Sequence, residues 1–168
     1  MQSQYRSFWY AAINDSNKHP ILRTYSLFKS KLNLEKYISY KIPTKYKRLI
    51  AQLRVSSHRL RIETGRHDRP ITPAEERFCK FCDKGAREGV IDDEKHFLLT
   101  CEFHDTERNI LFTAIKERDQ FLSRASNNKD VLFKYILCNE DRNIIEALGK
   151  YIEIGNKNRS KSFPVQVS

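Results

Sequence analysis

FCKFCDKGAREGVIDDEKHFLLTC, residues 78–101, holds three cysteines and one histidine in the order C-x2-C-x13-H-x4-C. Zn²⁺ prefers four tetrahedral ligands, and thiolate sulfur with imidazole nitrogen satisfies it without redox chemistry. The spacing therefore predicts a zinc site whose ligands are Cys79, Cys82, His96 and Cys101. Because protein side chains fill all four positions, we expect the zinc to be structural and not catalytic.

Two other interpretations of these residues stay open. The cysteines could be free thiols and His96 an ordinary histidine, but four such side chains within one short stretch favour a metal. His104 is a rival ligand, since Cys101-Glu-Phe-His104 has a two-residue spacing of its own, and it could replace His96 or Cys101. We prefer His96 because it better closes the loop that Cys82 begins.

Three consecutive acids, Asp92, Asp93 and Glu94, precede the histidine. They could form a magnesium site or the catalytic cluster of a metal-dependent nuclease. The alternative is that acids ahead of a short helix complement its dipole and accept a hydrogen bond from the second ring nitrogen of the histidine. We favour this structural role.

The composition favours a helical chain with an acidic partner. With 5 Gly and 5 Pro in 168 residues, disorder and collagen-like repeats are not expected, and the net charge of +10 favours a polyanion such as nucleic acid. The N-terminus lacks the apolar core of a signal peptide, and no apolar run reaches the roughly 18 residues of a membrane span. We therefore expect an intracellular protein, nuclear or cytoplasmic, with no membrane partner. In that reducing environment the cysteines are better suited to metal than to disulfides, and Cys138, in an apolar run, is predicted to be a buried thiol.

The segment before the cysteines, TKYKRLIAQLRVSSHRLRIETG at residues 44–65, is predicted to form one long basic helix. Apolar residues from Tyr46 to Leu60 fall on one face at about 100° per residue, and cationic residues fall on another. Thr44 is a plausible N-cap, and Gly65 a plausible C-terminal stop.

Most of the net charge lies in and around this helix. Residues 41–69 hold nine Lys or Arg against the two acids Glu63 and Asp68, a balance of +7. A basic face is often only solvated, but its position beside the zinc site favours contacts to phosphate. The candidate nucleic-acid-binding residues are Lys45, Lys47, Arg48, Arg54, His58, Arg59, Arg61 and Arg66. Of these, His58 is about as compatible with packing as with a contact.

The other segments are predicted to form helices and loops around the zinc site and the basic helix. Residues 1–20 carry an aromatic cluster, Tyr5 with residues 8–10, which we expect to pack on the body as a short helix and not to stack on bases. Asn33 is a possible N-cap for a short helix through Tyr40. Further helices are expected over 102–122, 129–138 and 141–154, the last ending at Gly155.

These expectations define a mainly α fold, in which a small zinc knuckle is inserted between the long basic helix and a C-terminal helical bundle. The predicted organisation is an N-terminal extension at 1–20, a single helical zinc-binding domain at 21–155 and a basic flexible tail at 156–168. The zinc knuckle occupies residues 78–104.

Several motifs together give the chain a family likeness. LRVSSHRLRIETGRH (53–67), FCKFC, IDDEKHFLLTC and the pair Glu107-Arg108 resemble the C-terminal zinc-binding region of reverse transcriptases from non-LTR (LINE-like) retrotransposons. LRTYSLFK (22–29) is similar to the segment that precedes this region. The resemblance implies a CCHC-type zinc module that follows a polymerase domain and helps to bind template RNA or target DNA. It also implies the four ligands predicted above. The chain departs from the pattern in its longer loop, with the insert DKGAREG, and at Glu102 and His104, where Pro and an aromatic residue are more typical.

We expect a structural-zinc module that binds RNA or DNA mainly through phosphates. The chain has no paired-aspartate polymerase motif and no endonuclease, so we expect a non-catalytic piece of such a protein, not an enzyme, with no small-molecule substrate. Other parts of a retrotransposon protein are possible partners. The alternative is a zinc-stabilised protein–protein interaction module, in which the helices after Cys101 dock on another chain.

Overall fold

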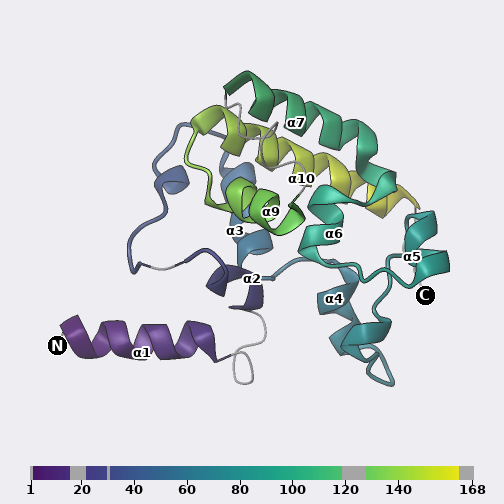
Figure 1. The fold of residues 1–168 in the computed structure, drawn as a ribbon, viewed down its shortest axis with the longest axis horizontal. Helices are drawn as coiled ribbons and strands as arrows, with labels where there is room; N and C mark the ends of the chain where they lie inside the picture. The colour runs from purple at the N-terminus through teal and green to yellow at the C-terminus, as the bar shows by residue number, and fades with distance from the viewer. Residues whose placement is uncertain (1, 16–21, 30, 119–127, 163–168) are drawn as a thin grey trace.

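The computed structural model describes residues 2–15, 22–29, 31–118 and 128–162 (Figure 1). Over these residues the chain is mainly α-helical, which confirms the predicted fold class. Its β pairing there is limited to one isolated antiparallel bridge between Phe78 and Ile91. No helix in the described part of the chain is both long and apolar enough to cross a bilayer.

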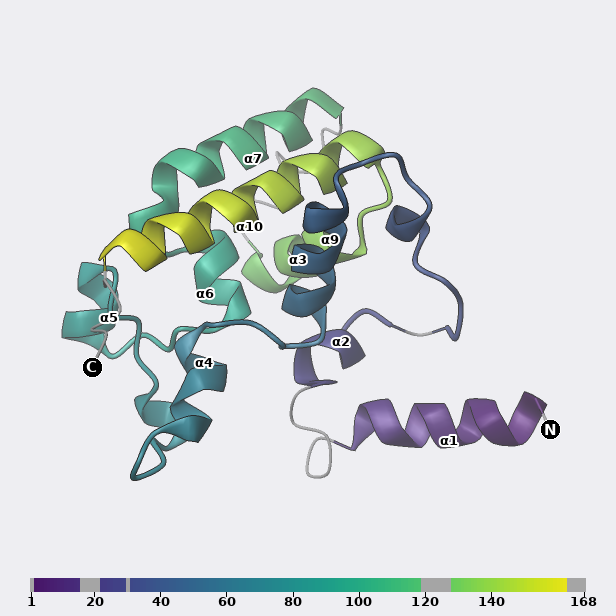
Figure 2. The same ribbon diagram turned by 180° about the vertical axis from the view of Figure 1, so that it is seen from behind.

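The body is a set of packed helices (Figures 1 and 2). The longest, α10 (Arg142–Ser162), packs against both α7 (Asp105–Arg118) and α3 (Thr44–Arg54), while α6 (Glu94–Leu99) packs against α9 (Lys129–Cys138). Their apolar faces share one core, since aliphatic and aromatic side chains at helical spacing are removed from water together. The most deeply buried of these side chains are Ile50, Leu53, Phe97, Leu98, Leu111, Ile115, Ile136, Leu137, Ile144, Leu148 and Tyr151.

Shorter elements complete the fold. The remaining described α-helices are α1 (Gln2–Asn14), α2 (Arg23–Ser26), α4 (Arg61–Thr64) and α5 (Asp83–Glu88), and single 3₁₀ turns lie at Lys36–Ile38, Gly65–His67, Ala74–Glu76 and Glu102–His104. The helix predicted at 129–138 is confirmed as α9. The helix predicted at 102–122 is α7, which starts after a 3₁₀ turn; residues 119–127 lie outside the described part of the chain.

The prediction of one long helix over 44–65 is wrong. Helix α3 ends at Arg54 and α4 begins at Arg61, and between them Ser56 takes a left-handed backbone with φ of 52°. Ser has low helix propensity because its hydroxyl competes for local hydrogen bonds. Here the Ser56 hydroxyl instead reaches across the fold and donates to Glu94 at 2.6 Å. A long-range contact therefore outweighs the helical periodicity of the segment.

Both predicted ends of that helix also differ. Pro43 is the N-cap residue of α3, so Thr44 is the first helical residue and makes no side-chain cap. Gly65 is not a left-handed stop, since its φ is −61°. A Cβ on Gly65 would lie 2.7 Å from the side chain of Arg77, so the glycine is required for close packing.

Helix α10 runs past its predicted end at Gly155 as far as Ser162, so residues 156–162 of the expected flexible tail are helical. Gly155 does not stop the helix because it lies against another element: a Cβ there would come within 2.9 Å of the Phe97 ring. Helix packing, not a C-terminal cap, explains this glycine.

Three smaller expectations are also wrong. The segment after Asn33 forms only the 3₁₀ turn Lys36–Ile38, and the Cys138 thiol is exposed. The N-terminal aromatic residues do form a helix, α1, but it contacts α2 at the margin of the molecule and leaves Tyr5 and Phe8 exposed (Figure 2).

A buried carboxylate holds three segments together. Glu94, at the start of α6, accepts hydrogen bonds on both carboxylate oxygens from one guanidinium nitrogen of Arg23, at 2.8 and 2.9 Å. It is also hydrogen-bonded to Ser56 and His58. Arg23 also pairs with Glu63 of α4. Burial opposes ionisation of Glu94, but the hydrogen bond and charge of His58, followed by Arg23 and Ser56, lower its pKa to about 2. The ionised form of Glu94 is therefore part of the folded state.

Replacing Glu94 with Gln should reduce the free energy of unfolding by about 3 kcal/mol at pH 7, because the pKa of Glu94 is lower in the folded chain than in the unfolded one. This stabilisation is present above the unfolded pKa near 4.3 and is lost as the pH falls towards 2. In urea titrations, the difference between wild type and E94Q should thus shrink below about pH 4. Glu75→Gln, at an exposed acid, is the control, and a pH-independent E94Q difference would contradict the assignment.

Candidate metal centre

Residues 77–92 form the first arm of the centre. The backbone N–H groups of Cys79 and Asp92 donate to Val90 and Arg77, both at 2.9 Å, which ties the entering and leaving chains together. Cys82 follows in the knuckle and is the N-cap of α5, where its sulfur accepts a bond from the N–H of Gly85 at 3.4 Å. A thiolate at this position is favoured by the helix N-terminus.

Helix α6 forms the second arm. Asp93 caps this helix by accepting from the His96 N–H at 2.7 Å, so the prediction that an acid supports the helix start is confirmed. The Nδ1 atom of His96 is hydrogen-bonded to the hydroxyl of Thr100 at 2.9 Å, which turns Nε2 towards the cysteines. Thr100, and not one of the acids, is therefore the partner of the second ring nitrogen. Cys101 lies just beyond the helix, where its N–H donates to the carbonyl of His96.

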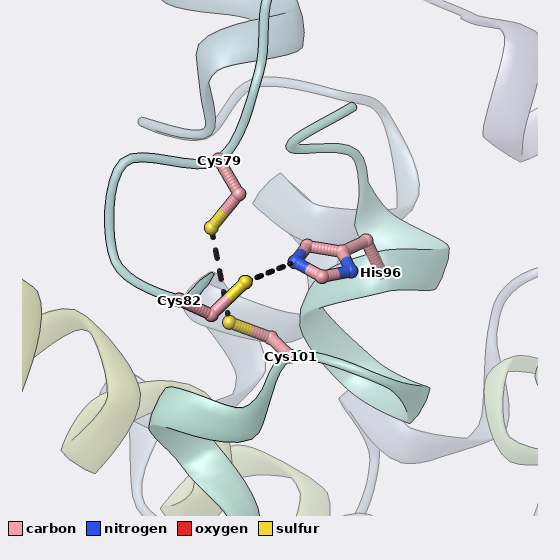
Figure 3. A group of neighbouring side chains, drawn as sticks. All are labelled: Cys79, Cys82, His96 and Cys101. Atoms are coloured by element: carbon pink, nitrogen blue, oxygen red, sulfur yellow. Dashed lines mark hydrogen bonds between the residues drawn. The ribbon is translucent and has the colours of Figure 1, made fainter. Parts of the chain in front are cut away.

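The two arms bring the four predicted ligand residues together (Figure 3). One ligand atom from each of Cys79, Cys82, His96 and Cys101 lies within 4.8 Å of all the others, and all four side chains are buried. The sulfurs of Cys79 and Cys101 are 3.8 Å apart, and the sulfur of Cys82 lies 3.4 Å from Nε2 of His96. A tetrahedron with metal–sulfur bonds of about 2.3 Å has edges of about 3.8 Å, so the group has the dimensions of a four-coordinate metal site.

The chemistry of the thiols also fits a cation. A hydrogen bond with Cys101, together with burial, raises the pKa of the Cys79 thiol to about 12, and burial raises the pKa of Cys82. Without a positive ion the thiols of Cys79 and Cys82 stay protonated at neutral pH, whereas the hydrogen bond with Cys79 lowers the pKa of Cys101. A metal ion would supply the compensating charge and displace the protons.

A buried ion pair lies next to the centre. Arg159 of α10 forms two bonds of 2.9 Å with Asp92, and its guanidinium lies over the rings of Phe81 and Phe97. Phe81 stands between Cys79 and Cys82 in the sequence, so α10 contacts the knuckle directly. The pair thereby connects the last described helix to both arms of the metal-binding group.

His104, the rival ligand, lies outside the group. Its ring is fully buried, and Nε2 accepts a bond from Arg159 at 3.0 Å. Burial and the charges of Arg159 and Arg108 lower the pKa of His104 to about 3, so the ring is neutral and acts as an acceptor. His104 is a packing residue beneath the centre and not one of the four clustered residues.

The three consecutive acids do not converge on a second site. Asp92 pairs with Arg159, Asp93 caps α6 and Glu94 binds Arg23 and His58. The one group of potential metal ligands among the described residues is the cluster of three cysteines and a histidine.

The structure divides the predicted nucleic-acid-binding residues into two sets. Three are held inside the domain: Arg54 is buried against Glu35 and His58 is bonded to Glu94. Arg61 forms a two-bond pair with Asp68 at 2.6 and 3.1 Å. Periodicity placed all three on one face of a single helix, but His58 and Arg61 lie beyond the end of α3. Arg54, the last residue of α3, is instead buried by its contact with Glu35.

The other five lie at or near the surface. Lys45 pairs with Glu153, Lys47 donates to the carbonyl of Ile38, and Arg66 pairs with Glu63. Among the described residues, no acidic partner is found for the exposed side chains of Arg48 and Arg59.

Sequence reasoning missed Arg159, which it placed in a flexible tail. A signal was present, since Leu148, Ile152, Gly155 and Arg159 continue the i, i+4, i+7 spacing of the buried face of α10. This continuity was not recognised because Gly155 was interpreted as the end of the helix, a common role for glycine.

No protein-family model, curated protein or solved structure matches the chain. The resemblance to the retrotransposon region therefore stays a prediction that rests on the sequence motifs alone.

Replacing Arg159 with Met should lower the free energy of unfolding by about 3–5 kcal/mol, because Asp92 would stay buried without its cation. Denaturant unfolding at fixed metal concentration measures the loss. The exposed Lys157 on the same helix offers a matched control, and Lys157→Met should change stability by no more than about 0.5 kcal/mol. Adding Asp92→Asn to Arg159→Met should restore part of the lost stability. If Arg159→Met and Lys157→Met were equally stable, the Arg159–Asp92 ion pair would not stabilise the domain.

Proposed function

We propose that Cys79, Cys82, His96 and Cys101 hold a structural Zn²⁺ ion. Three thiolates and one imidazole are a donor set that zinc prefers, and the observed spacing of their atoms suits tetrahedral coordination. All four positions are protein side chains, so no position is left for a substrate. The ion would act by joining the knuckle to α6, and through Phe81 and Arg159 to α10.

We further infer that the zinc-stabilised domain binds nucleic acid through phosphate contacts. The observation that carries this is the imbalance of charge in residues 41–69. Both acids of this segment are engaged within the domain, Glu63 by Arg23 and Arg66 and Asp68 by Arg61. The exposed cations of residues 41–69 that have no acidic partner within the described part of the chain are Lys41, Arg48, Arg59 and Arg69.

Such a surface suits a polyanion more than a folded protein of mixed charge. Contacts from Arg and Lys to phosphate supply affinity with little dependence on sequence. RNA and DNA both present these phosphates, so either satisfies the proposal. The role that the retrotransposon resemblance implies, support for template or target binding by other parts of a larger protein, is consistent with this surface.

The zinc proposal predicts about one Zn²⁺ per purified chain by metal analysis. Cys79→Ser or Cys101→Ser should lose the ion, and chelation should unfold the region of residues 78–101, since metal binding contributes directly to folding in sites of this kind. His104→Gln is the decisive control because this variant should keep the full metal content. Zinc far below one per chain in the wild type would exclude the proposal.

The nucleic-acid proposal predicts binding that weakens steeply with salt. Converting Arg48, Arg59 and Arg69 together to Gln should reduce the slope of log K against log salt concentration by about 2 to 3, at roughly one unit per lost phosphate contact. Fluorescence anisotropy with labelled RNA and duplex DNA measures these slopes.

Three exposed lysines on α7 and α9, Lys116, Lys129 and Lys134, give a control of equal charge. Their conversion to Gln should leave the slope nearly unchanged. If the wild type, with zinc bound, fails to bind either nucleic acid at low salt, the domain is better explained as a protein-interaction module.

A further inference from the structure

Helix α1 presents aromatic rings to solvent. Tyr5 is 62% exposed, Phe8 is 74% exposed and Tyr10 is 46% exposed, whereas Ile13 is buried. The helix contacts α2 and otherwise lies at the margin of the molecule in both views (Figures 1 and 2). Large apolar side chains exposed together indicate an interaction site more often than chance exposure. The expectation that these rings pack on the body is thus wrong for Tyr5 and Phe8.

The charge of this helix limits what can cover the rings. Residues 2–14 contain no Asp or Glu and one cation, Arg6, which is exposed and follows Tyr5 in the sequence. Each chain carries a net charge of +10, so a second copy would be repelled at long range. A polyanion would be attracted to the same surface.

The spacing of the rings suits bases. Tyr5 and Phe8 are three residues apart, and helical residues at this separation are neighbours about 5–6 Å apart at Cβ. Aromatic side chains beside a cation are the elements that non-specific single-strand binding proteins use, because every base has a face on which a ring can stack. In a duplex those faces are already covered by neighbouring base pairs.

We propose that α1 is a stacking platform for single-stranded nucleic acid, on which Tyr5 and Phe8 stack on unpaired bases while Arg6 contacts phosphate. The inference rests on the proposed function and makes it more specific. The cations of residues 41–69 bind phosphates of any nucleic acid, and α1 adds a preference for unpaired strands.

The helix carries its own reporter. Trp9 is the only tryptophan in the chain, and its ring meets that of Tyr10 edge to face with centroids 5.2 Å apart. A base that stacks on the neighbouring rings changes the surroundings of Trp9. Tryptophan fluorescence, excited at a wavelength that tyrosine does not absorb, therefore reports on α1.

The test uses the full chain with zinc bound and two probes, a single-stranded RNA of about 20 nucleotides and a duplex DNA of the same length. The single strand should quench Trp9 fluorescence and bind more tightly than the duplex. Tyr5→Leu/Phe8→Leu keeps apolar side chains but removes the ring faces. It should weaken single-strand binding by about tenfold or more and duplex binding by less than about twofold.

A matched control is Ile110→Ala on α7, which removes an apolar side chain that is 53% exposed and should leave both affinities unchanged. Equal loss for single strand and duplex in the double variant would overturn the platform while leaving the phosphate-binding function intact. A dimer, detected by sedimentation equilibrium and abolished by the double variant with RNA affinity unchanged, would show that a second copy covers the rings. Absence of binding to both probes would overturn the proposed function and this inference together.

Discussion

A buried ion pair between Arg159 of α10 and Asp92, two residues ahead of α6, joins the end of the described chain to the metal-binding arms. Removing two charges from water is costly, and the pair is favourable only because each group finds further partners. Asp92 also accepts from the backbone of Arg61, and Arg159 donates to His104 and lies over two aromatic rings. Four elements distant in sequence must therefore be in place before either charge can be buried.

The domain is stabilised in two different ways in its two halves. Around α3, α7, α9 and α10, apolar side chains form a continuous core that needs no metal. Around residues 78–104 the buried group is small and consists of the three cysteines with Phe81 and Phe103. A segment that short cannot bury enough apolar surface to hold itself, which is the situation in which proteins use a structural ion. The ion pair at Asp92 couples the two halves.

The sequence was most informative where structure depends on near neighbours. The spacing of Cys79, Cys82, His96 and Cys101 identified the clustered group, and the pattern of residues 129–138 identified α9, because ligand spacing and helical periodicity are local properties. It was least informative where a distant partner decides. The sequence predicts Arg54 as a surface cation, but in the fold it is buried against Glu35. The helix break at Ser56 depends on a hydrogen bond to Glu94, which is 38 residues away. Periodicity cannot reveal such partners, so neither the end of α3 nor the burial of Arg54 could be predicted from it.

Helix α5 fills much of the loop between Cys82 and His96, the second and third of the clustered residues. The residues that follow Cys82 form a separate helix, capped by Cys82 at one end and by the left-handed Gly89 at the other. Only Gly85 must stay small, because a Cβ there would overlap the carbonyl group of Cys79. Seven of the 13 residues between Cys82 and His96 are taken up by α5 and its Gly89 turn, so the long interval in sequence does not separate the two side chains in space.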